Sequence, residues 1–323
     1  MSIRSTVLAL VLAASAPLLS WAEPAYPDKP VKLLVGYAPG GSTDLVARLI
    51  ATALTARWGQ QVVVENRPGA SGMIAAEQTV RAAPDGYTLL LGYTPEVSLN
   101  SLVFKNMRYD PVSDLSAITL VASAPLVLVS GPKLPVTDMK SLLARKNASE
   151  PMTYGSPGIG GQQHMAGEML ARLTGLRLTH VPYRGTSLAV SDLIGGQIDL
   201  FFATTPPLLQ HIRAGKLHAL AVAGPRREKL LPDVPTVVEL GLPRLQLTNW
   251  FGVFGPKALP ESMQKKISTD VMAILSQPAF VRSLEDQGLS ATPLQGAALH
   301  DFIAAEMKKY QAIVAETGIS AEP

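Results

Sequence analysis

Two segments decide the fold: Tyr37-Ala38-Pro39-Gly40-Gly41-Ser42-Thr43-Asp44 in the first half of the chain, and Gly155-Ser156-Pro157-Gly158-Ile159-Gly160-Gly161-Gln162-Gln163-His164 in the second. Each lies between a predicted strand and a predicted helix. A glycine-rich turn lets the backbone approach a ligand closely, and the helix that follows directs free N–H groups and its positive dipole end at the same point. The sequence therefore predicts two anion-binding loops, one in each half of the chain.

The length and composition indicate a two-lobed globular protein. At 323 residues the chain exceeds the size at which a single core usually stops growing. The net charge is only +3, and the Lys and Arg residues are scattered, so a nucleic-acid partner is not expected. The sequence has no cysteine, which excludes disulfide bonds and thiolate zinc sites.

The first 22 residues have the pattern of a signal peptide. Arg4 provides a positive start, an apolar run extends from Val7 to Leu19, and Ser20-Trp21-Ala22 offers a cleavage point. A membrane anchor is the alternative, but it needs about 20 apolar residues to cross a bilayer. We therefore expect residues 1–22 to be removed on export, with the mature protein beginning near Glu23.

The first half alternates between predicted strands and helices. Apolar residues recur every four positions from Leu45 to Leu54, which indicates an amphipathic helix that ends at Gly59. A second helix is predicted over Met73–Ala82. The predicted strands are Val31–Gly36, Val62–Glu65 and Tyr87–Leu91. This alternation is typical of a parallel sheet covered by helices.

The second half repeats the pattern, which completes an α/β fold with two lobes. Two apolar stretches bounded by prolines, Ile118–Val129 and Leu247–Phe254, are predicted to cross between the lobes. Strands are predicted at Met152–Tyr154, Arg177–Val181, Ile198–Phe202 and Leu217–Ala223, and C-terminal helices at Glu261–Leu275 and Leu299–Glu316. We assign residues 23–125 and 251–323 to lobe 1, and residues 126–250 to lobe 2.

Nearly the whole mature chain, from Tyr26 to about Ile319, resembles the Bug family of periplasmic solute-binding receptors, which are associated with tripartite tricarboxylate transporters. The resemblance is specific because many short phrases occur in the same order and spacing. Besides the first loop, these phrases are Val64-Glu65-Asn66-Arg67-Pro68-Gly69-Ala70, Pro84-Asp85-Gly86-Tyr87-Thr88-Leu89, Val181-Pro182-Tyr183-Arg184-Gly185, Gly195-Gly196-Gln197-Ile198-Asp199, Ala214-Gly215-Lys216-Leu217, Leu231-Pro232-Asp233-Val234-Pro235-Thr236 and Trp250-Phe251-Gly252.

The resemblance implies a periplasmic-binding-protein (Venus flytrap) fold with two crossover hinge strands. It implies that a small carboxylate is held in the cleft by backbone amides, hydroxyls and bridging waters, and is delivered to the membrane subunits of a transporter. No cofactor and no metal are expected, and a monomer is expected. Many members have Asp where this chain has Ala203, so the chain lacks one plausible partner for a ligand ammonium group.

The residues expected to bind the ligand lie in the two loops or beside the cleft. They are Tyr37, Pro39, Gly40, Gly41, Ser42, Thr43, Asp44, Thr94, Gly155, Ser156, Gly158, Gly160, Gln162, His164, Tyr183, Thr204 and Trp250.

Several of these residues also have a structural interpretation. Ser42 or Thr43 is expected to cap the helix, and Asp44 suits the first helical turn, where a carboxylate favours the dipole. His164 either donates to the ligand or bridges the loop and its helix. A metal pair with Glu168 lacks a third ligand nearby in the sequence.

Two cationic and two aromatic residues near the cleft also have two possible interpretations each. Arg67 and Arg184 either brace a turn carbonyl or pair with a ligand carboxylate. Trp250 and Phe251 either pack the hinge or, with Tyr37 and Tyr93, form a wall of the pocket.

Enzyme motifs are missing from the sequence. It contains no G-x-S-x-G, P-loop or H-E-x-x-H motif, and Gly158-Ile159-Gly160 lacks the third glycine of a dinucleotide-binding fingerprint. We therefore expect a binding protein. The alternatives are a ligand-sensing receptor for a membrane signalling partner and an exported carboxylate-processing enzyme.

Export predicts a specific mature mass. Periplasmic material should lack Met1 to Ala22 because the Ser20-Trp21-Ala22 site is cut, and intact-mass spectrometry measures this directly. A mass that retains the first 22 residues would contradict the prediction.

Overall fold

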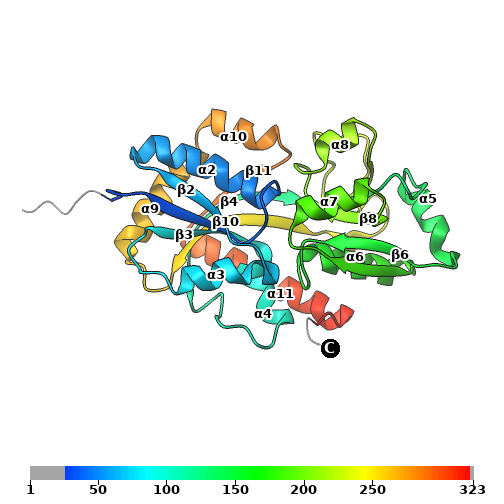
Figure 1. The fold of residues 1–323 in the computed structure, drawn as a ribbon, viewed down its shortest axis with the longest axis horizontal. Coiled ribbons are helices and arrows are strands. Elements are labelled where there is room, and N and C mark those ends of the chain that lie inside the picture. The colour runs from blue at the N-terminus through cyan, green and yellow to red at the C-terminus, as the bar shows by residue number, and fades with distance from the viewer. Residues whose placement is uncertain (1–25, 321–323) are drawn as a thin grey trace, which may run out of the picture.

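The computed structural model describes residues 26–320, which form two mixed sheets connected by long strands (Figure 1). The expected signal peptide lies outside these residues. The first sheet has the strand order β11-β4-β10-β3-β1-β2. Its strands are β1 (Val31–Val35), β2 (Val62–Asn66), β3 (Thr88–Tyr93), β4 (Leu115–Pro125), β10 (Thr248–Pro256) and β11 (Ser290–Leu294). No helix between residues 26 and 320 is long and apolar enough to cross a membrane.

The second sheet has the strand order β7-β6-β8-β5-β9. Its strands are β5 (Val127–Ser130), β6 (Met152–Ser156), β7 (Leu178–Pro182), β8 (Leu200–Ala203) and β9 (His218–Val222). Only Leu126 separates β4 of the first sheet from β5 of the second, and β10 returns the chain to the first sheet. The two predicted crossings are therefore these strands.

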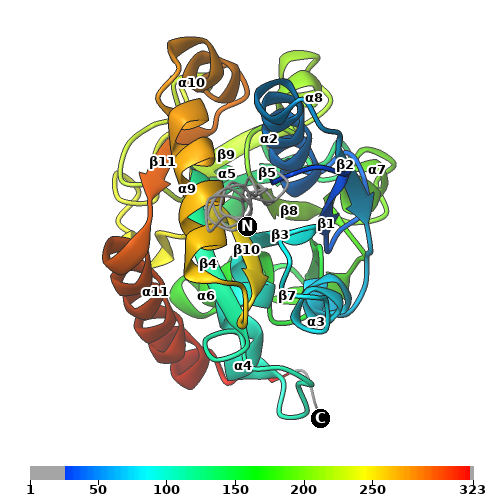
Figure 2. The same ribbon diagram turned by 90° about the vertical axis from the view of Figure 1, so that its left-hand side faces the viewer.

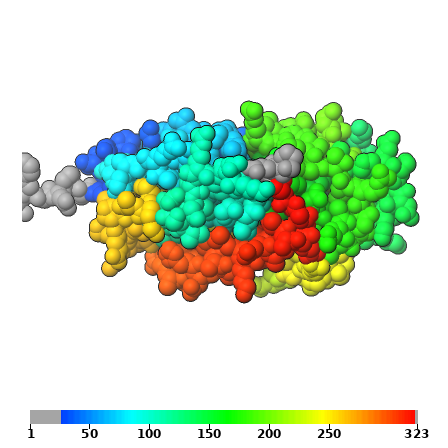
Figure 3. Space-filling view, turned by 90° about the horizontal axis from the view of Figure 1, so that it is seen from below, coloured from blue at the N-terminus to red at the C-terminus, as the bar shows by residue number. Residues whose placement is uncertain are grey.

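Helices cover both sheets. They are α2 (Ser42–Trp58), α3 (Met73–Val80), α4 (Asn100–Val103), α5 (Met139–Leu143), α6 (Gln162–Thr174), α7 (Thr186–Ile194), α8 (Leu209–Arg213), α9 (Glu261–Leu275), α10 (Pro278–Glu285) and α11 (Gly296–Thr317). Figure 2 shows α2 and α3 on opposite faces of the first sheet. The last helix, α11, packs on both β4 and α6, and Figure 3 shows its red end beside the green part of the chain.

The strand directions correct one expectation. β1 pairs in parallel with β2 and β3, as the alternation of strands and helices predicts. The sheet is nevertheless mixed, because β10 is antiparallel to β3 and β4. β5 is likewise antiparallel to β8 and β9. A strand that returns from the other lobe enters the sheet from the opposite end, so it runs against its neighbours.

A buried carboxylate joins α2 to α9. Asp270 is 4% exposed and accepts hydrogen bonds from Arg57 Nε (2.6 Å) and Trp58 Nε1 (2.7 Å), and it also pairs with Lys266. Two residues at the end of α2 are thus held by one side chain of α9. These contacts fix the position of α2 on its sheet, and the start of the same helix faces the cleft.

Asp270→Asn should destabilise the protein by about 1–3 kcal/mol, because the new amide N–H₂ would face the N–H donors of Arg57 or Trp58. Urea denaturation measures the change. Asp286→Asn, at an exposed site, is the matched control and should leave the midpoint unchanged. Equal midpoints for the two variants would contradict the prediction.

Candidate functional site

Three helices begin at the boundary between the lobes with glycine N-caps. These residues are Gly41 of α2, Gly161 of α6 and Gly185 of α7, and none of the three helices has a side-chain cap. The first N–H groups of each helix are therefore not bonded to a cap, and each helix end carries a positive partial charge. Such ends bind anions without any cationic side chain.

The expected capping by Ser42 or Thr43 is wrong. The N-cap of α2 is Gly41, and Ser42 Oγ instead lies 2.5 Å from Thr204 Oγ1 in the other lobe. This contact joins the start of α2 to the end of β8. The hydroxyl group therefore links the two lobes instead of satisfying its own helix.

A small cavity lies where these helix ends meet. Its volume is about 10 Å³, close to the space that one water occupies. Apart from two tyrosines, its lining has no titratable side chain. The lining residues are Tyr37, Gly41, Ser42, Thr43, Tyr93, Pro157, Gln163, Thr186, Thr204, Asn249 and Phe251. We call this the inner cavity.

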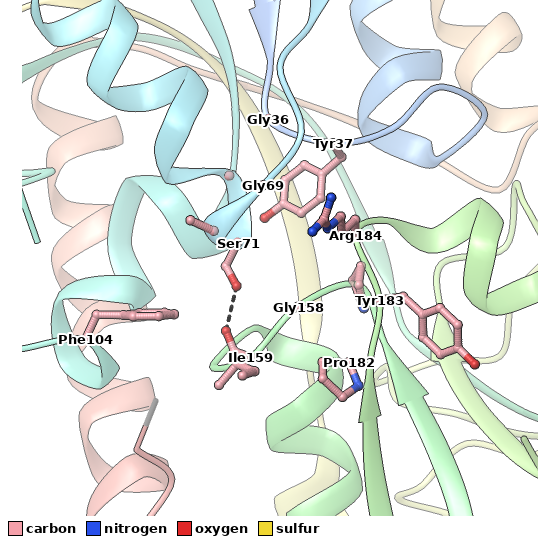
Figure 4. Close-up of a pocket in the computed structure, with 13 residues that line it drawn as sticks. Gly36, Tyr37, Gly69, Ser71, Phe104, Gly158, Ile159, Pro182, Tyr183 and Arg184 are labelled. Carbon is pink, nitrogen blue, oxygen red and sulfur yellow. Dashed lines mark hydrogen bonds between the residues drawn. The ribbon is translucent and has the colours of Figure 1, made fainter. Parts of the chain in front are cut away.

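A larger cavity of about 220 Å³ adjoins it, and we call this the outer cavity (Figure 4). Tyr37 and Pro157 line both cavities. The other lining residues of the outer cavity are Gly36, Gly69, Ala70, Ser71, Gly72, Phe104, Gly158, Ile159, Pro182, Tyr183 and Arg184. Its lining is mostly apolar, and Arg184 is its one charged residue.

Hydrogen bonds across the cleft hold the lobes together in this structure. Gln163 Nε2 donates to the Tyr93 hydroxyl at 2.6 Å, and Ser71 Oγ donates to the Ile159 carbonyl at 2.7 Å, as Figure 4 shows. Ser71 has a φ of 50°, a strained backbone conformation for a residue with a side chain. Because the two hydrogen bonds join the lobes, the structure represents a closed arrangement.

A buried carboxyl group lies behind Tyr37. Glu96 is fully buried in a π-helical turn over Pro95–Leu99, and it accepts hydrogen bonds from the Tyr37 hydroxyl (2.9 Å) and the Tyr93 backbone N–H (2.8 Å). Burial raises the pKa of Glu96 to about 8. The group is therefore mostly protonated at neutral pH and places little negative charge behind the helix ends. The sequence analysis missed this residue.

Part of the predicted site lines the cavities. Tyr37, Gly41, Ser42, Thr43 and Thr204 line the inner cavity. Tyr37, Gly158 and Tyr183 line the outer one, although the Tyr183 hydroxyl donates to Asp192 and its ring points away from the cavity in Figure 4. The predicted residues that line neither cavity are Pro39, Gly40, Asp44, Thr94, Gly155, Ser156, Gly160, Gln162, His164 and Trp250.

In the first loop, Pro39 and Gly40 are exposed, and Asp44 supports the loop from within. Asp44 accepts hydrogen bonds from the Gly40 N–H (3.1 Å), from Arg48 (3.0 Å) and from Asn66 (3.0 Å). Burial raises the pKa of Asp44, but these hydrogen bonds outweigh it and the pKa lies below its usual value. Asp44 is therefore an ionised brace for the turn.

On the hinge strand, Trp250 faces away from the cleft. Its ring packs against Phe302 at 5.5 Å on the opposite face of β10, while Asn249 and Phe251 line the inner cavity. Thr94 exchanges hydrogen bonds with the Trp250 backbone at 3.0 and 3.2 Å. The expected aromatic wall is thus formed by Phe251 and the tyrosines, and including Trp250 was wrong because neighbouring strand residues point to opposite faces.

Packing and hydrogen bonds hold the second loop in place. A Cβ at Gly155 would meet Ile198 at 2.6 Å, so this glycine serves close packing. Gln162 Nε2 donates to the Thr248 carbonyl at 2.7 Å and also contacts the Tyr310 hydroxyl. The neighbouring Gln163 of α6, which sequence reasoning missed, lines the inner cavity together with Pro157 of this loop.

Two stacked histidines support the same loop. The rings of His164 and His180 lie 3.8 Å apart, and Ser156 Oγ lies 2.7 Å from His180 Nε2. His164 Nδ1 accepts the Gly160 N–H at 3.1 Å, so His164 bridges loop and helix. Burial, and secondarily the neighbouring His164, lower the pKa of His180 to about 3, and burial lowers the pKa of His164. Both rings are neutral at pH 7.

The described residues contain no group of three His, Cys, Asp or Glu side chains that could hold a metal ion. The site therefore consists of helix ends, hydroxyls, carboxamides and aromatic rings.

Comparison with known proteins places the chain among receptors of one kind. A family model described as "Tripartite tricarboxylate transporter family receptor" matches residues 46–319. BugT of Bordetella pertussis is 35% identical over 298 residues, which cover 91% of this chain and 90% of BugT. A solved R. palustris structure with adipate is 30% identical, with a TM-score of 0.88 and coverage of 91% and 99%. MatC from Rhodopseudomonas palustris with bound malate is 29% identical, with a TM-score of 0.84 and coverage of 90% and 100%. These likenesses confirm the two-lobed fold.

The histidine pair predicts a pH dependence of stability. A lowered pKa favours the neutral ring, so the contribution of His180 is complete above its ordinary pKa of about 6.5 and is lost as the pH falls toward about 3. His180→Gln keeps an N–H for Ser156 without this titration. Urea denaturation at pH 7.0 and 4.5 should therefore show a smaller loss of stability in the variant, and an equal loss would contradict the interpretation.

Proposed function

The chain belongs to the tripartite tricarboxylate transporter family receptors, the Bug family of periplasmic solute-binding proteins, and from this membership we propose that it captures a small carboxylate between its lobes and delivers it to the membrane subunits of such a transporter. Adipate and malate, the ligands named for two structural neighbours, are acids of this class.

The observation that carries the proposal is the convergence of three uncapped helix ends on one cavity. Residues Gly41–Thr43 of α2 come from the first lobe, whereas Gln163 of α6 and Thr186 of α7 come from the second. All three ends favour an anion, and no carboxylate lines the cavity to oppose it. A carboxylate between the lobes would therefore be attracted from both sides.

These interactions are sufficient for binding. Four hydrogen bonds to a charged carboxylate contribute about 1.5–3 kcal/mol each, and each helix end adds about 0.3–1 kcal/mol. The loss of translational and rotational freedom removes several kcal/mol. The remainder is on the order of −8 kcal/mol, which corresponds to a micromolar Kd.

The proposed lobes are residues 23–125 with 251–323, and residues 126–250. Their boundaries lie in β4–β5 and in β10, the strands that connect the two sheets. Because the ligand-binding groups come from both lobes, only the closed state completes the set. A ligand then shifts the equilibrium toward closure by its difference in affinity for the two states.

We further propose that the chain has no enzymatic role. The Ser156–His180 contact resembles a nucleophile and its base, but Ser156 is fully buried and its hydroxyl also donates to the Gly158 carbonyl at 2.7 Å. A substrate has no access to this oxygen. The pair is better explained as a support for the second loop.

Gly41→Val and Gly161→Val should each weaken carboxylate binding at least 100-fold without unfolding the protein. Both glycines have ordinary backbone angles, with φ of −88° and −71°. A Cβ at Gly41 would lie 3.6 Å from Thr186, and one at Gly161 would lie 3.6 Å from Pro95, each across the cleft. The additional methyl groups of valine would therefore obstruct closure.

A thermal-shift screen of malate, succinate, adipate, citrate and benzoate identifies an acid for calorimetry, since a ligand of the native state raises Tm. Ser42→Ala removes one hydrogen bond and should cost only about 0.5–2 kcal/mol. Ala83→Val, on an exposed turn, is the control for added bulk. If both glycine variants bind with wild-type affinity, the helix ends are not the site.

A further inference from the structure

Two carboxamide residues that line the inner cavity each have a buried oxygen without a hydrogen-bond partner among residues 26–320. These oxygens are Gln163 Oε1 on α6 and Asn249 Oδ1 on β10, and each residue is only 2% exposed. A buried acceptor without a partner costs about 1–3 kcal/mol. Two such acceptors at one cavity, contributed by a second-lobe helix and the hinge strand, indicate that the cavity receives a hydrogen-bond donor.

Because of the Tyr93 hydroxyl, at least one of these oxygens lacks a partner whichever way the amides are oriented. Gln163 Nε2 donates to it at 2.6 Å, and Asn249 also hydrogen-bonds to it. A hydroxyl has one hydrogen, so it can donate to only one of the two carboxamides. If one amide group were rotated to place its oxygen on Tyr93, the other would still direct N–H₂ at Tyr93 and leave its oxygen unpaired.

The donor that suits these oxygens is neutral. An ammonium group would need a nearby negative charge, because an unpaired buried charge is strongly unfavourable. No carboxylate lines the cavity, and β8 ends in Ala203. Glu96 lies behind Tyr37 and is mostly protonated at neutral pH, because burial raises its pKa to about 8. Three positive helix ends would also repel an ammonium group.

Taking the proposed carboxylate site as the starting point, we infer that the preferred ligand is a 2-hydroxy acid, whose carboxylate meets the helix ends while the adjacent hydroxyl donates to Gln163 or Asn249. Gly41–Thr43 line the inner cavity together with both amides. Groups of one ligand that reach the helix start and an amide at this cavity must therefore lie on neighbouring carbons. The remainder of the acid extends past Tyr37 into the outer cavity.

Calorimetry on matched acids tests this inference with the mature wild-type protein at pH 7. The sets are succinate, malate and aspartate; propionate, lactate and alanine; and phenylacetate, mandelate and phenylglycine, with both enantiomers of each chiral acid. Within each set that binds, one enantiomer of the hydroxy acid should bind at least 10-fold tighter than the unsubstituted acid and the amino acid. Equal affinities, or preference for the amino acid, would overturn the inference and leave carboxylate binding intact. If no carboxylate binds, the proposed function itself fails.

Variants assign the preference to the amides. Asn249→Leu and Gln163→Leu should each reduce the ratio of hydroxy-acid to unsubstituted-acid affinity, and the double variant should bring it within about 2-fold of unity. Asn249→Asp keeps the shape and supplies a carboxylate, so it should raise amino-acid affinity relative to the hydroxy acid. Thermal melts control for folding. A wild-type ratio in a folded double variant would show that the hydroxyl is recognised elsewhere and would overturn the assignment.

Discussion

The structure depends on the electrostatics of helix ends that have no caps. A side-chain cap would satisfy the first N–H groups of α2, α6 and α7, but each helix begins at a glycine and leaves them available. Burial also keeps the ionisable groups near the site in their uncharged forms. Glu96 is mostly protonated, and the stacked histidines are neutral, because burial disfavours their charged forms. Neutral surroundings keep the field of the helix ends directed at the ligand.

The hinge strand β10 connects this site to the apolar clusters on both faces of the first sheet. Asn249 and Phe251 point into the cleft, while Trp250 between them packs in the core on the opposite face. The same strand pairs with β4 along its length and with β3 over Phe251–Phe254. Any change in the position of β10 therefore affects the cavity and the first-lobe core together, and the strand that allows the lobes to move also supplies contacts at the site.

Much of the fold could be predicted from local patterns. Apolar periodicity and glycine or proline turns located β1, α2 and β2, and the repeat of this order revealed a second lobe. β11 was missed because Ser290–Leu294 is a short strand at the edge of its sheet, with polar residues and a proline. α10 and the π-helical turn over Pro95–Leu99 were also not predicted.

The site was predicted less completely, because its details depend on contacts between residues far apart in the sequence. Ser42 bonds to Thr204 across the cleft, and Tyr37 meets Glu96 from 59 residues away. The choice between Trp250 and Phe251 depends on the orientation of one strand, which two adjacent aromatic residues do not reveal. The alternation of strand faces would, however, have placed Asn249 beside Phe251.

The uncharged lining of the inner cavity determines how the protein responds to its surroundings. Mobile ions screen interactions between exposed charges, with a Debye length of about 8 Å at physiological ionic strength. Here the attraction comes from helix ends that act within the first turn and are covered when the lobes close. Dissolved salt therefore has little access to the interactions that hold the ligand. Groups covered by closed lobes are screened less by mobile ions than groups on an open surface.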